Sequence, residues 1–242
     1  MKKHIVLSSL LFLSIAMIMF GVFTMIHNHF LRAQEDAMIR DIVEIIISDD
    51  PEEEIDKTDW VREAMSQNAD TIGWLEVPGT RINTPVVQRN NNDFYLYHNF
   101  QKRRDPAGWV FADFRNDFPE LNTNTILYGH TLRASRVVFS DLSRMLNRNF
   151  FNNEENFYID FTTIEEEHRF RIFSVYTIRP TDDYLVTTFA DAEEYRAFQE
   201  KVRGRSVHRL GTRISAHLPM LTLSTCSPGQ TRLVVHAILV ED

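Results

Sequence analysis

Residues 5–26 contain no charged side chain and consist mainly of Leu, Ile, Met, Phe and Val. An apolar helix needs about 20 residues to cross the hydrocarbon core of a bilayer, so this run of 22 residues is long enough to span it. A cleaved signal peptide has a shorter apolar region, typically about 7–15 residues, followed by a cleavage site with small residues. Residues 27–32 read HNHFLR and contain no such site. The sequence therefore favours a retained transmembrane anchor over a cleaved signal peptide.

The flanking charges predict how this anchor is oriented. Lys2 and Lys3 lie on its short N-terminal side, and basic residues accumulate on the cytoplasmic side of membrane segments. We therefore expect residues 1–4 in the cytoplasm, residues 5–26 in the cell membrane and residues 27–242 outside the cell. The chain is predicted to be a single-pass membrane protein.

The composition of residues 27–242 limits their partners and their covalent chemistry. They contain 24 Lys and Arg against 34 Asp and Glu. A nucleic-acid partner requires a basic face, so none is expected. Cys226 is the single cysteine, which excludes an intrachain disulfide. An unpaired extracytoplasmic cysteine indicates intermolecular pairing or a reactive thiol, and a buried, inert cysteine is the alternative.

Two helices are predicted between the anchor and the remainder of the chain. Residues 33–48 place Met38 and Ile42 at helical spacing, and an acidic segment with a proline ends this pattern. A second helix is predicted at 59–67. Together, residues 27–69 form a predicted juxtamembrane helical extension that docks on the domain and sets its distance from the membrane.

The pattern changes at Thr71, where short β-rich runs begin to alternate with turn signals. The predicted strands are 73–77, 82–88, 108–113, 124–128, 157–162, 170–178, 221–225 and 233–240. This density of short strands predicts a mainly β fold over residues 70–242, a closed or nearly closed barrel. Helical inserts are expected at 139–146 and 191–203. The acidic run 165–167 is predicted to be a solvated hairpin tip; a calcium site is the alternative, although carboxylates alone do not define a coordination shell.

Cys226 lies at the end of a predicted strand, and a loop of five residues separates it from Arg232, which begins the next one. If the two strands pair as a hairpin, Cys226 and Arg232 lie across from each other at its mouth. A cation there favours the thiolate, and a guanidinium can also bind an oxyanion or substrate carbonyls. The structural alternative for Arg232 is a surface ion pair.

His130 is the predicted imidazole partner of the cysteine. It follows the strand 126–128 and a predicted turn at Gly129. A cysteine nucleophile needs a nearby imidazole, as general acid for the leaving amine and as base for the incoming nucleophile. Of the other histidines, His236 is the main competitor, but it lies inside an apolar strand, which favours a buried structural role. His168 and His208 lie in polar contexts and are expected at the surface.

The motifs around these residues resemble the signature of sortases, the surface transpeptidases of Gram-positive bacteria. They are TLSTC at 222–226, the following Arg232, and YGH at 128–130. The resemblance covers most of residues 70–242 and extends to the segments 73–80, 85–88, 92–96 and 107–113. The helical insert at 191–203, the N-terminal helices and the VVHA run in the last strand resemble class B within this family.

The resemblance implies a mechanism without a metal or organic cofactor. The Cys226 thiolate attacks a backbone carbonyl in a sorting motif near the C-terminus of a secreted protein. Arg232 stabilises the oxyanion, and His130 protonates the departing amine. The thioester then passes to an amine of a cell-wall peptide or to a pilin lysine. The resemblance also implies a set of substrate-binding residues that line a groove for the motif: Asn92, Leu96, Tyr128, Ser224 and Thr225.

Some features depart from the family pattern. The loop 227–231 is short and lacks the acidic residue that often follows the cysteine in class B, so no supporting carboxylate is expected there. Asp50-Pro51 is followed by Glu52 rather than by an aromatic residue, unlike the lid of pilus-building class C enzymes.

Two rival functions remain open. An L,D-transpeptidase would share the anchor and the thiol, but its cysteine typically follows Ser-His-Gly, whereas Ser224 and Thr225 precede Cys226. The other rival is a non-enzymatic, membrane-anchored binding module in which Cys226 is buried and inert.

Overall fold

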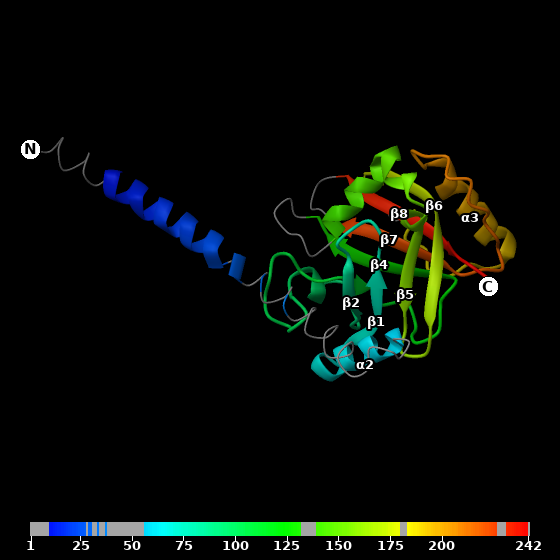
Figure 1. The fold of residues 1–242 in the computed structure, drawn as a ribbon, viewed down its shortest axis with the longest axis horizontal. Coiled ribbons are helices and arrows are strands. Elements are labelled where there is room, and N and C mark those ends of the chain that lie inside the picture. The colour runs from blue at the N-terminus through cyan, green and yellow to red at the C-terminus, as the bar shows by residue number, and fades with distance from the viewer. Residues whose placement is uncertain are drawn as a thin grey trace, which may run out of the picture. The chain divides into compact units, whose positions relative to one another are not determined.

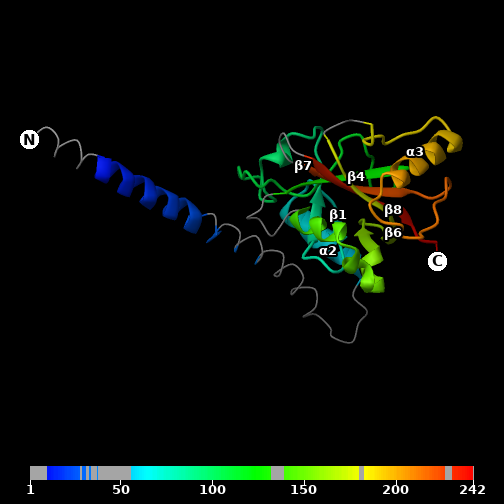
Figure 2. The same ribbon diagram turned by 90° about the horizontal axis from the view of Figure 1, so that it is seen from above.

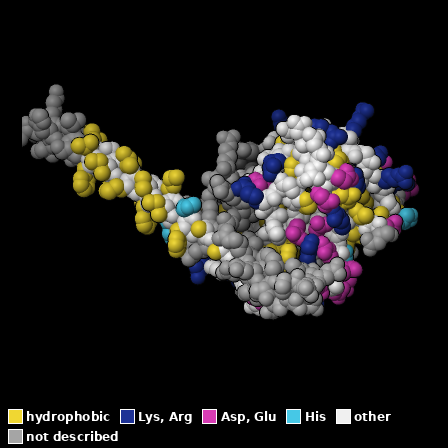
Figure 3. All heavy atoms as spheres, in the orientation of Figure 1, with side chains coloured by type: hydrophobic (Ala, Val, Ile, Leu, Met, Phe, Trp, Pro, Cys, Tyr) yellow, Lys and Arg dark blue, Asp and Glu magenta, His cyan; other side chains and the backbone are white. Residues whose placement is uncertain are grey.

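The computed structural model describes residues 10–27, 29, 30, 33, 37 and 56–241, apart from 132–138, 180–182, 227–230 and the side chain of Cys226. The chain divides into two units, Met1–Glu44 and Ile45–Asp242. In the first unit, a helix at Leu10–His27 has a mean hydropathy of 2.2 and is long and apolar enough to cross a membrane. Hydrophobic side chains cover its visible face (Figure 3). The predicted helix at 33–48 lies almost entirely outside the described residues.

The second unit contains a closed barrel of eight strands in the order β1-β2-β3-β4-β7-β8-β6-β5 (Figure 1). Their bounds are β1 Thr71–Glu76, β2 Asn83–Val87, β3 Phe111–Ala112, β4 Asn124–His130, β5 Tyr158–Thr162, β6 Glu167–Ile178, β7 Met220–Cys226 and β8 Arg232–Leu239. Two neighbouring pairs are parallel, β2 with β3 and β4 with β7, and the others are antiparallel. The prediction of a mainly β, closed barrel is confirmed, and each predicted strand has its counterpart.

Helix α2 (Lys57–Gln67) packs against the barrel. It begins after Asp56, whose carboxylate accepts a hydrogen bond from the backbone N–H of Thr58 at 2.8 Å, the usual way to satisfy a free N–H at a helix start. Its buried face carries Trp60, which meets Trp74 of β1 edge-on with ring centroids 5.5 Å apart. The helix predicted at 59–67 therefore exists and starts two residues earlier.

The helical inserts lie between the barrel strands. Four 3₁₀ segments are η1 (Phe94–Leu96), η2 (Phe139–Leu146), η3 (Arg148–Asn152) and η4 (Glu154–Phe157), and α3 (Ala192–Gly204) connects β6 to β7. Helix α3 lies against the outside of the barrel in both ribbon views (Figure 1, Figure 2). Its buried residues Tyr195, Phe198 and Val202 join an apolar cluster with residues of β6, β7 and β8. The middle of this outer face is therefore sealed from solvent.

Candidate active site

The ends of three neighbouring strands bring the predicted catalytic positions together. Strand β4 pairs in parallel with β7, and the register runs from Asn124↔Met220 to His130↔Cys226. Strand β8 pairs antiparallel with β7 as far as Ser224↔Val234. Continuing that register by two residues sets Cys226 opposite Arg232. Because neighbouring strands lie about 4.8 Å apart, the three backbones meet at one end of the barrel wall.

The turn predicted at Gly129 is wrong, because β4 continues through it to His130. The pairing of Gly129 with Thr225 keeps the backbone extended. A Cβ at Gly129 would lie 2.7 Å from the ring of Phe139. The glycine therefore allows a close approach of η2 to β4 rather than a change of chain direction.

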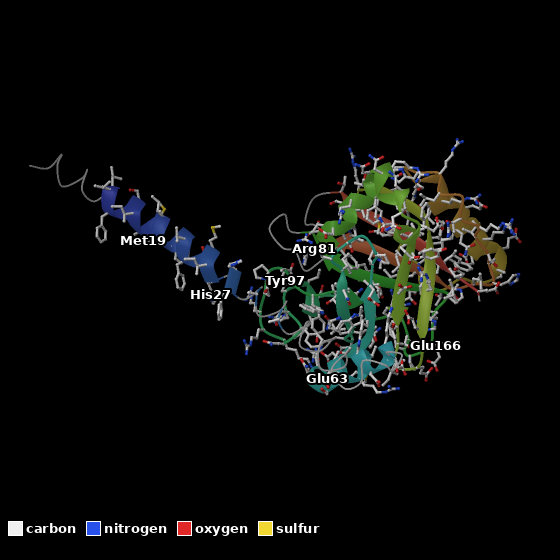
Figure 4. All side chains as sticks on the ribbon, viewed as in Figure 1. Met19, His27, Glu63, Arg81, Tyr97 and Glu166 are labelled. Atoms are coloured by element: carbon white, nitrogen blue, oxygen red, sulfur yellow. The ribbon has the colours of Figure 1, made fainter. Side chains whose placement is uncertain are left out.

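His130 is held by the backbone of the segment that contains η1. This histidine is 6% exposed, and its Nε2 lies 2.9 Å from the carbonyl oxygen of Leu96. A carbonyl can only accept, so Nε2 donates in this bond. Neutral His130 is then the Nε2–H tautomer, with Nδ1 as the basic nitrogen. The residue after Leu96, Tyr97, is 52% exposed at the surface (Figure 4).

Arg232 is oriented by Tyr184, a residue that was not predicted from the sequence. Nη1 of Arg232 donates to the Tyr184 hydroxyl at 3.2 Å, and that hydroxyl lies 3.0 Å from Oγ of Ser224. Tyr184 is completely buried. This residue belongs to the connection between β6 and β7 and forms part of no motif, so the sequence offers no signal for it.

Asn92 and Tyr128 are brought together by a carboxylate that was also not predicted from the sequence. Oδ2 of Asp113 accepts from the Tyr128 hydroxyl at 2.7 Å and from Nδ2 of Asn92 at 3.2 Å. Nε and Nη2 of Arg115 donate to its two oxygens, each at 2.8 Å. Burial raises the pKa of Asp113, but the hydrogen bonds from Arg115 and Tyr128 outweigh burial and leave that pKa below its ordinary value.

Thr225 differs from the other predicted substrate-binding residues. It is 1% exposed, and its hydroxyl accepts from the backbone N–H of Leu233 at 2.8 Å. Side chains alternate along a strand, so Thr225 lies on the opposite face of β7 from Ser224. The structure therefore groups Thr225 with the hairpin of β7 and β8, not with Asn92 and Tyr128.

The connection between β6 and β7 is tied to the barrel by several side chains. Nη2 of Arg115 donates to the carbonyl of Leu185 at 3.0 Å, and Nδ2 of Asn124 donates to the carbonyl of Val186 at 2.7 Å. Asp183 forms ion pairs with Arg205 and Lys201 of the α3 region, and their hydrogen bonds lower its pKa to about 2. These bonds fix the segment that carries Tyr184.

His236 lies in the sealed part of the same outer face. Its Nε2 lies 3.0 Å from the Tyr176 hydroxyl and its Nδ1 lies 2.9 Å from the Thr222 hydroxyl. The Thr222 hydroxyl donates to Oδ1 of Asn124 at 2.7 Å, so it accepts from Nδ1–H, and Nε2 accepts from Tyr176. Burial, with a smaller contribution from Arg205, lowers the pKa of His236 to about 3. These contacts support a structural role.

Other expectations about polar residues have mixed outcomes. His168, expected at the surface, is only 8% exposed, because the alternation of β6 turns it inward. Near the predicted hairpin tip, Lys57 of α2 bridges Glu76 and Glu167 at 2.6 and 2.7 Å. Within the part of the chain that the structure describes, no group of three or more His, Cys, Asp or Glu side chains is arranged to hold a metal ion.

The chain is similar to known proteins over most of the barrel unit. A family model described as the sortase domain matches residues 75–240. Sortase B of Listeria monocytogenes is 32% identical over 188 residues, which cover 75% of this chain and 74% of that protein. Sortase B of Staphylococcus aureus is 31% identical over 173 residues, covering 72% and 70%.

Solved structures agree with this similarity. A substrate complex of Staphylococcus aureus sortase B superposes with a TM-score of 0.79 at 28% identity, covering 88% of this chain and 98% of that one. Sortase B of Bacillus anthracis gives a TM-score of 0.75 at 32% identity, covering 88% and 100%. A sortase B complexed with triglycine gives a TM-score of 0.79 at 27% identity, covering 88% and 99%.

Proposed function

The chain belongs to the class B sortases, which are cysteine transpeptidases, and from this premise we propose that Cys226, His130 and Arg232 carry out the transpeptidation. The observation that carries the assignment is the strand register. It pairs His130 with Cys226 and, continued along β8, sets Arg232 beside them. The backbone positions of a cysteine, a histidine and an arginine are thereby neighbours, and these are the residue types that catalysis by a thiol nucleophile requires.

The first half of the reaction cleaves the donor peptide. The Cys226 thiolate attacks the scissile carbonyl carbon, and N–H groups of Arg232 bind the oxygen as it becomes negative. Collapse of this intermediate breaks the C–N bond and leaves a thioester on Cys226. His130 as imidazolium gives a proton to the departing amine. The Nε2 bond to Leu96 supports Nδ1 as the nitrogen that transfers this proton.

The second half forms the new amide bond. An incoming amine attacks the thioester carbonyl, the C–S bond breaks, and His130 takes up the proton that the amine loses. The thiolate and the imidazolium are thereby restored. Tyr184 supports both halves, because its hydroxyl holds the guanidinium of Arg232 from the side of β7. No step requires a cofactor.

The donor that we propose is a sorting motif near the C-terminus of a secreted protein. The acceptor is an amine of a cell-wall peptide, with a pilin lysine as the alternative. The relative complexed with triglycine supports a peptide acceptor, since triglycine has a free terminal amine. Residues Asn92, Leu96, Tyr128 and Ser224 are proposed to contact the motif. Thr225 is retained with a supporting role through the β7–β8 hairpin.

The proposed location is the outer face of the cell membrane. Residues 5–26 anchor the chain, with residues 1–4 in the cytoplasm, residues 27–69 as a helical extension and residues 70–242 as the extracellular catalytic domain. The apolar helix Leu10–His27 supports the anchor by its length and composition. Lys2 and Lys3 support the orientation.

Mass spectrometry of the protein mixed with a panel of sorting peptides tests the function. We expect an acyl adduct on Cys226 that is discharged when an amine is added. Cys226→Ala is expected to lose the adduct, cleavage and transfer completely, because the chain has no other cysteine to form a thioester. Transfer by the alanine variant would contradict the assignment. Failure of a thiol reagent to modify native Cys226 would instead favour the inert binding module.

A further inference from the structure

One buried carboxylate outside the proposed catalytic residues organises three separate segments of the chain. Asp113, which follows β3, has no exposed surface. Its two oxygens accept five hydrogen bonds, two of which come from the side chains of Asn92 and Tyr128. The other three come from the backbone N–H, Nε and Nη2 of Arg115. A buried carboxylate requires such partners, because an unpaired buried charge is costly.

Arg115 extends this arrangement to the connection between β6 and β7. The same Nη2 that contacts Asp113 also donates to the carbonyl of Leu185, the residue after Tyr184. The planar guanidinium binds the carboxylate and the carbonyl in a fixed relative orientation. The ammonium group of a lysine has no planar fork and does not impose this orientation. Asp113 and Arg115 thus link the segment before η1, strand β4 and the β6–β7 connection.

The hydrogen bonds define what Tyr128 and Asn92 can offer to a peptide. The only proton of the Tyr128 hydroxyl is donated to Asp113, so the ring is fixed by its far end. Asn92 uses one N–H on Asp113 and accepts from the backbone N–H of Phe114 at 3.0 Å. Its remaining N–H and second lone pair have a defined direction. Both side chains are therefore oriented before any peptide arrives, which lowers the entropic cost of binding.

We propose that Asp113 and Arg115 are a positioning pair that holds Asn92, Tyr128 and the β6–β7 connection in the arrangement that binds the sorting peptide. The inference rests on the proposed function, because it takes Asn92 and Tyr128 as peptide-binding residues. The pair acts on the KM for the donor peptide and not on the chemical steps. Loss of Arg115 frees the carbonyl of Leu185, but Asn124 still holds Val186 and Asp183 keeps its ion pairs, so Tyr184 remains beside Arg232.

The test compares conservative variants of the full-length chain in detergent micelles. Asp113→Asn keeps the shape of the side chain but replaces one accepting oxygen with an NH₂ group, which faces the donors of the neighbouring residues. Arg115→Lys keeps the charge but loses the fork, and Tyr128→Phe keeps the ring but loses the bond to Asp113. We expect each to raise the KM for the sorting peptide, about tenfold or more for Asp113→Asn, which disturbs charged hydrogen bonds. In the Asp113→Asn and Arg115→Lys variants, the kcat and the rate of Cys226 alkylation should stay within about threefold.

Matched controls come from a second buried carboxylate that lies far from the proposed site. Asp160 of β5 is 9% exposed and lies 3.7 Å from Nε of Arg169. Strand β5 is four places from β4 in either direction around the barrel. Asp160→Asn and Arg169→Lys should change the melting temperature without changing the peptide KM. These two variants show how the melting temperature and the peptide KM respond when a buried carboxylate has only a structural role.

The outcomes separate the inference from the function on which it rests. A raised KM with nearly unchanged kcat and alkylation supports the positioning pair. An unchanged KM in the Asp113→Asn and Arg115→Lys variants overturns it, even where the melting temperature falls as it does in the controls. If Asp113→Asn does not fold, the KM of Arg115→Lys decides. A wild-type chain that forms no acyl-enzyme with any peptide overturns the proposed function first.

Discussion

Two histidines on neighbouring parts of the same outer barrel face have opposite surroundings. His130 lies at the end of β4, where a backbone carbonyl holds one ring nitrogen. His236 lies in the middle of β8 beneath α3, where two hydroxyl groups hold both ring nitrogens among the rings of Phe173, Tyr176 and Phe198. The residue type is the same, so we infer the different roles from the position of each histidine along its strand. A strand end can present an imidazole to a substrate, whereas the sealed middle removes it from proton exchange.

The strongest way to break this comparison is to remove each imidazole in turn. We expect His130→Ala to lower kcat about 10²–10⁴-fold, the usual contribution of general acid–base catalysis, and to lower the melting temperature less than His236→Ala does. His236→Ala should retain kcat in its folded fraction and lose stability, because it leaves a cavity and unpaired hydroxyl groups. For a domain of this size each kcal/mol lost corresponds to about 2–4 °C in melting temperature.

Transpeptidation rates and melting curves of both variants provide the measurement. A fully active His130→Ala protein would show that another group moves the proton. A loss of kcat in folded His236→Ala would mean that the sealed region participates in catalysis, and the contrast between the two histidines would disappear.

Arg232 sharpens the comparison at the strand ends where His130 also lies. We expect Arg232→Lys to lower kcat/KM for transfer by about 10²-fold, because lysine lacks the planar fork that can hold Tyr184 and an oxyanion together. Lysine keeps the positive charge, so the rate of simple alkylation at Cys226 should change little. Equal loss of transfer and alkylation would mean that Arg232 only favours the thiolate. Near-normal transfer would remove it from the oxyanion role.

The barrel itself was predictable because each of its strands has a local sequence pattern. Short apolar runs bounded by turn residues predicted all eight strands and the helix of the β6–β7 connection. The turn at Gly129 was mispredicted because the local preference of glycine suggested a turn. Pairing with β7 and contact with Phe139 instead require an extended glycine at this position. His168 was misplaced because its acidic neighbours suggested exposure, while strand alternation buries it.

The supporting residues of the site were not predictable by such reasoning. Tyr184 meets Ser224 across 40 residues, and Asp113 meets Tyr128 across 15. These contacts depend on how distant segments are brought together by the register of the sheet. Tyr184 belongs to no motif, and Asp113 ends the segment 107–113 without a chemical role being predicted for it. Cys226, His130 and Arg232 could be proposed because their chemistry requires a particular combination of residue types. The groups that orient them follow from packing.

The last effect that we predict is a pH dependence of stability to which His236 contributes. Its pKa is about 3 in the folded protein, against about 6.5 in an unfolded chain. Between these values the unfolded state binds a proton that the folded state excludes. The free energy of unfolding therefore falls as the pH drops from 6.5 towards 3, by up to about 1.4 kcal/mol per pH unit. Its contribution is complete above pH 6.5.

Urea denaturation of the wild type and of His236→Asn between pH 7 and pH 4 isolates this contribution. Asparagine can still donate to Thr222, but it is smaller than histidine, so the variant should be less stable at pH 7. It has no titrating group, so its free energy of unfolding should fall less steeply on acidification. The lowered pKa values of His168 and Asp113 contribute equally to both proteins and cancel in the difference. The two stability curves should therefore approach each other as the pH falls. Parallel curves would mean that His236 is protonated in the folded state over the same pH range as in the unfolded chain, and that the region beneath α3 admits protons.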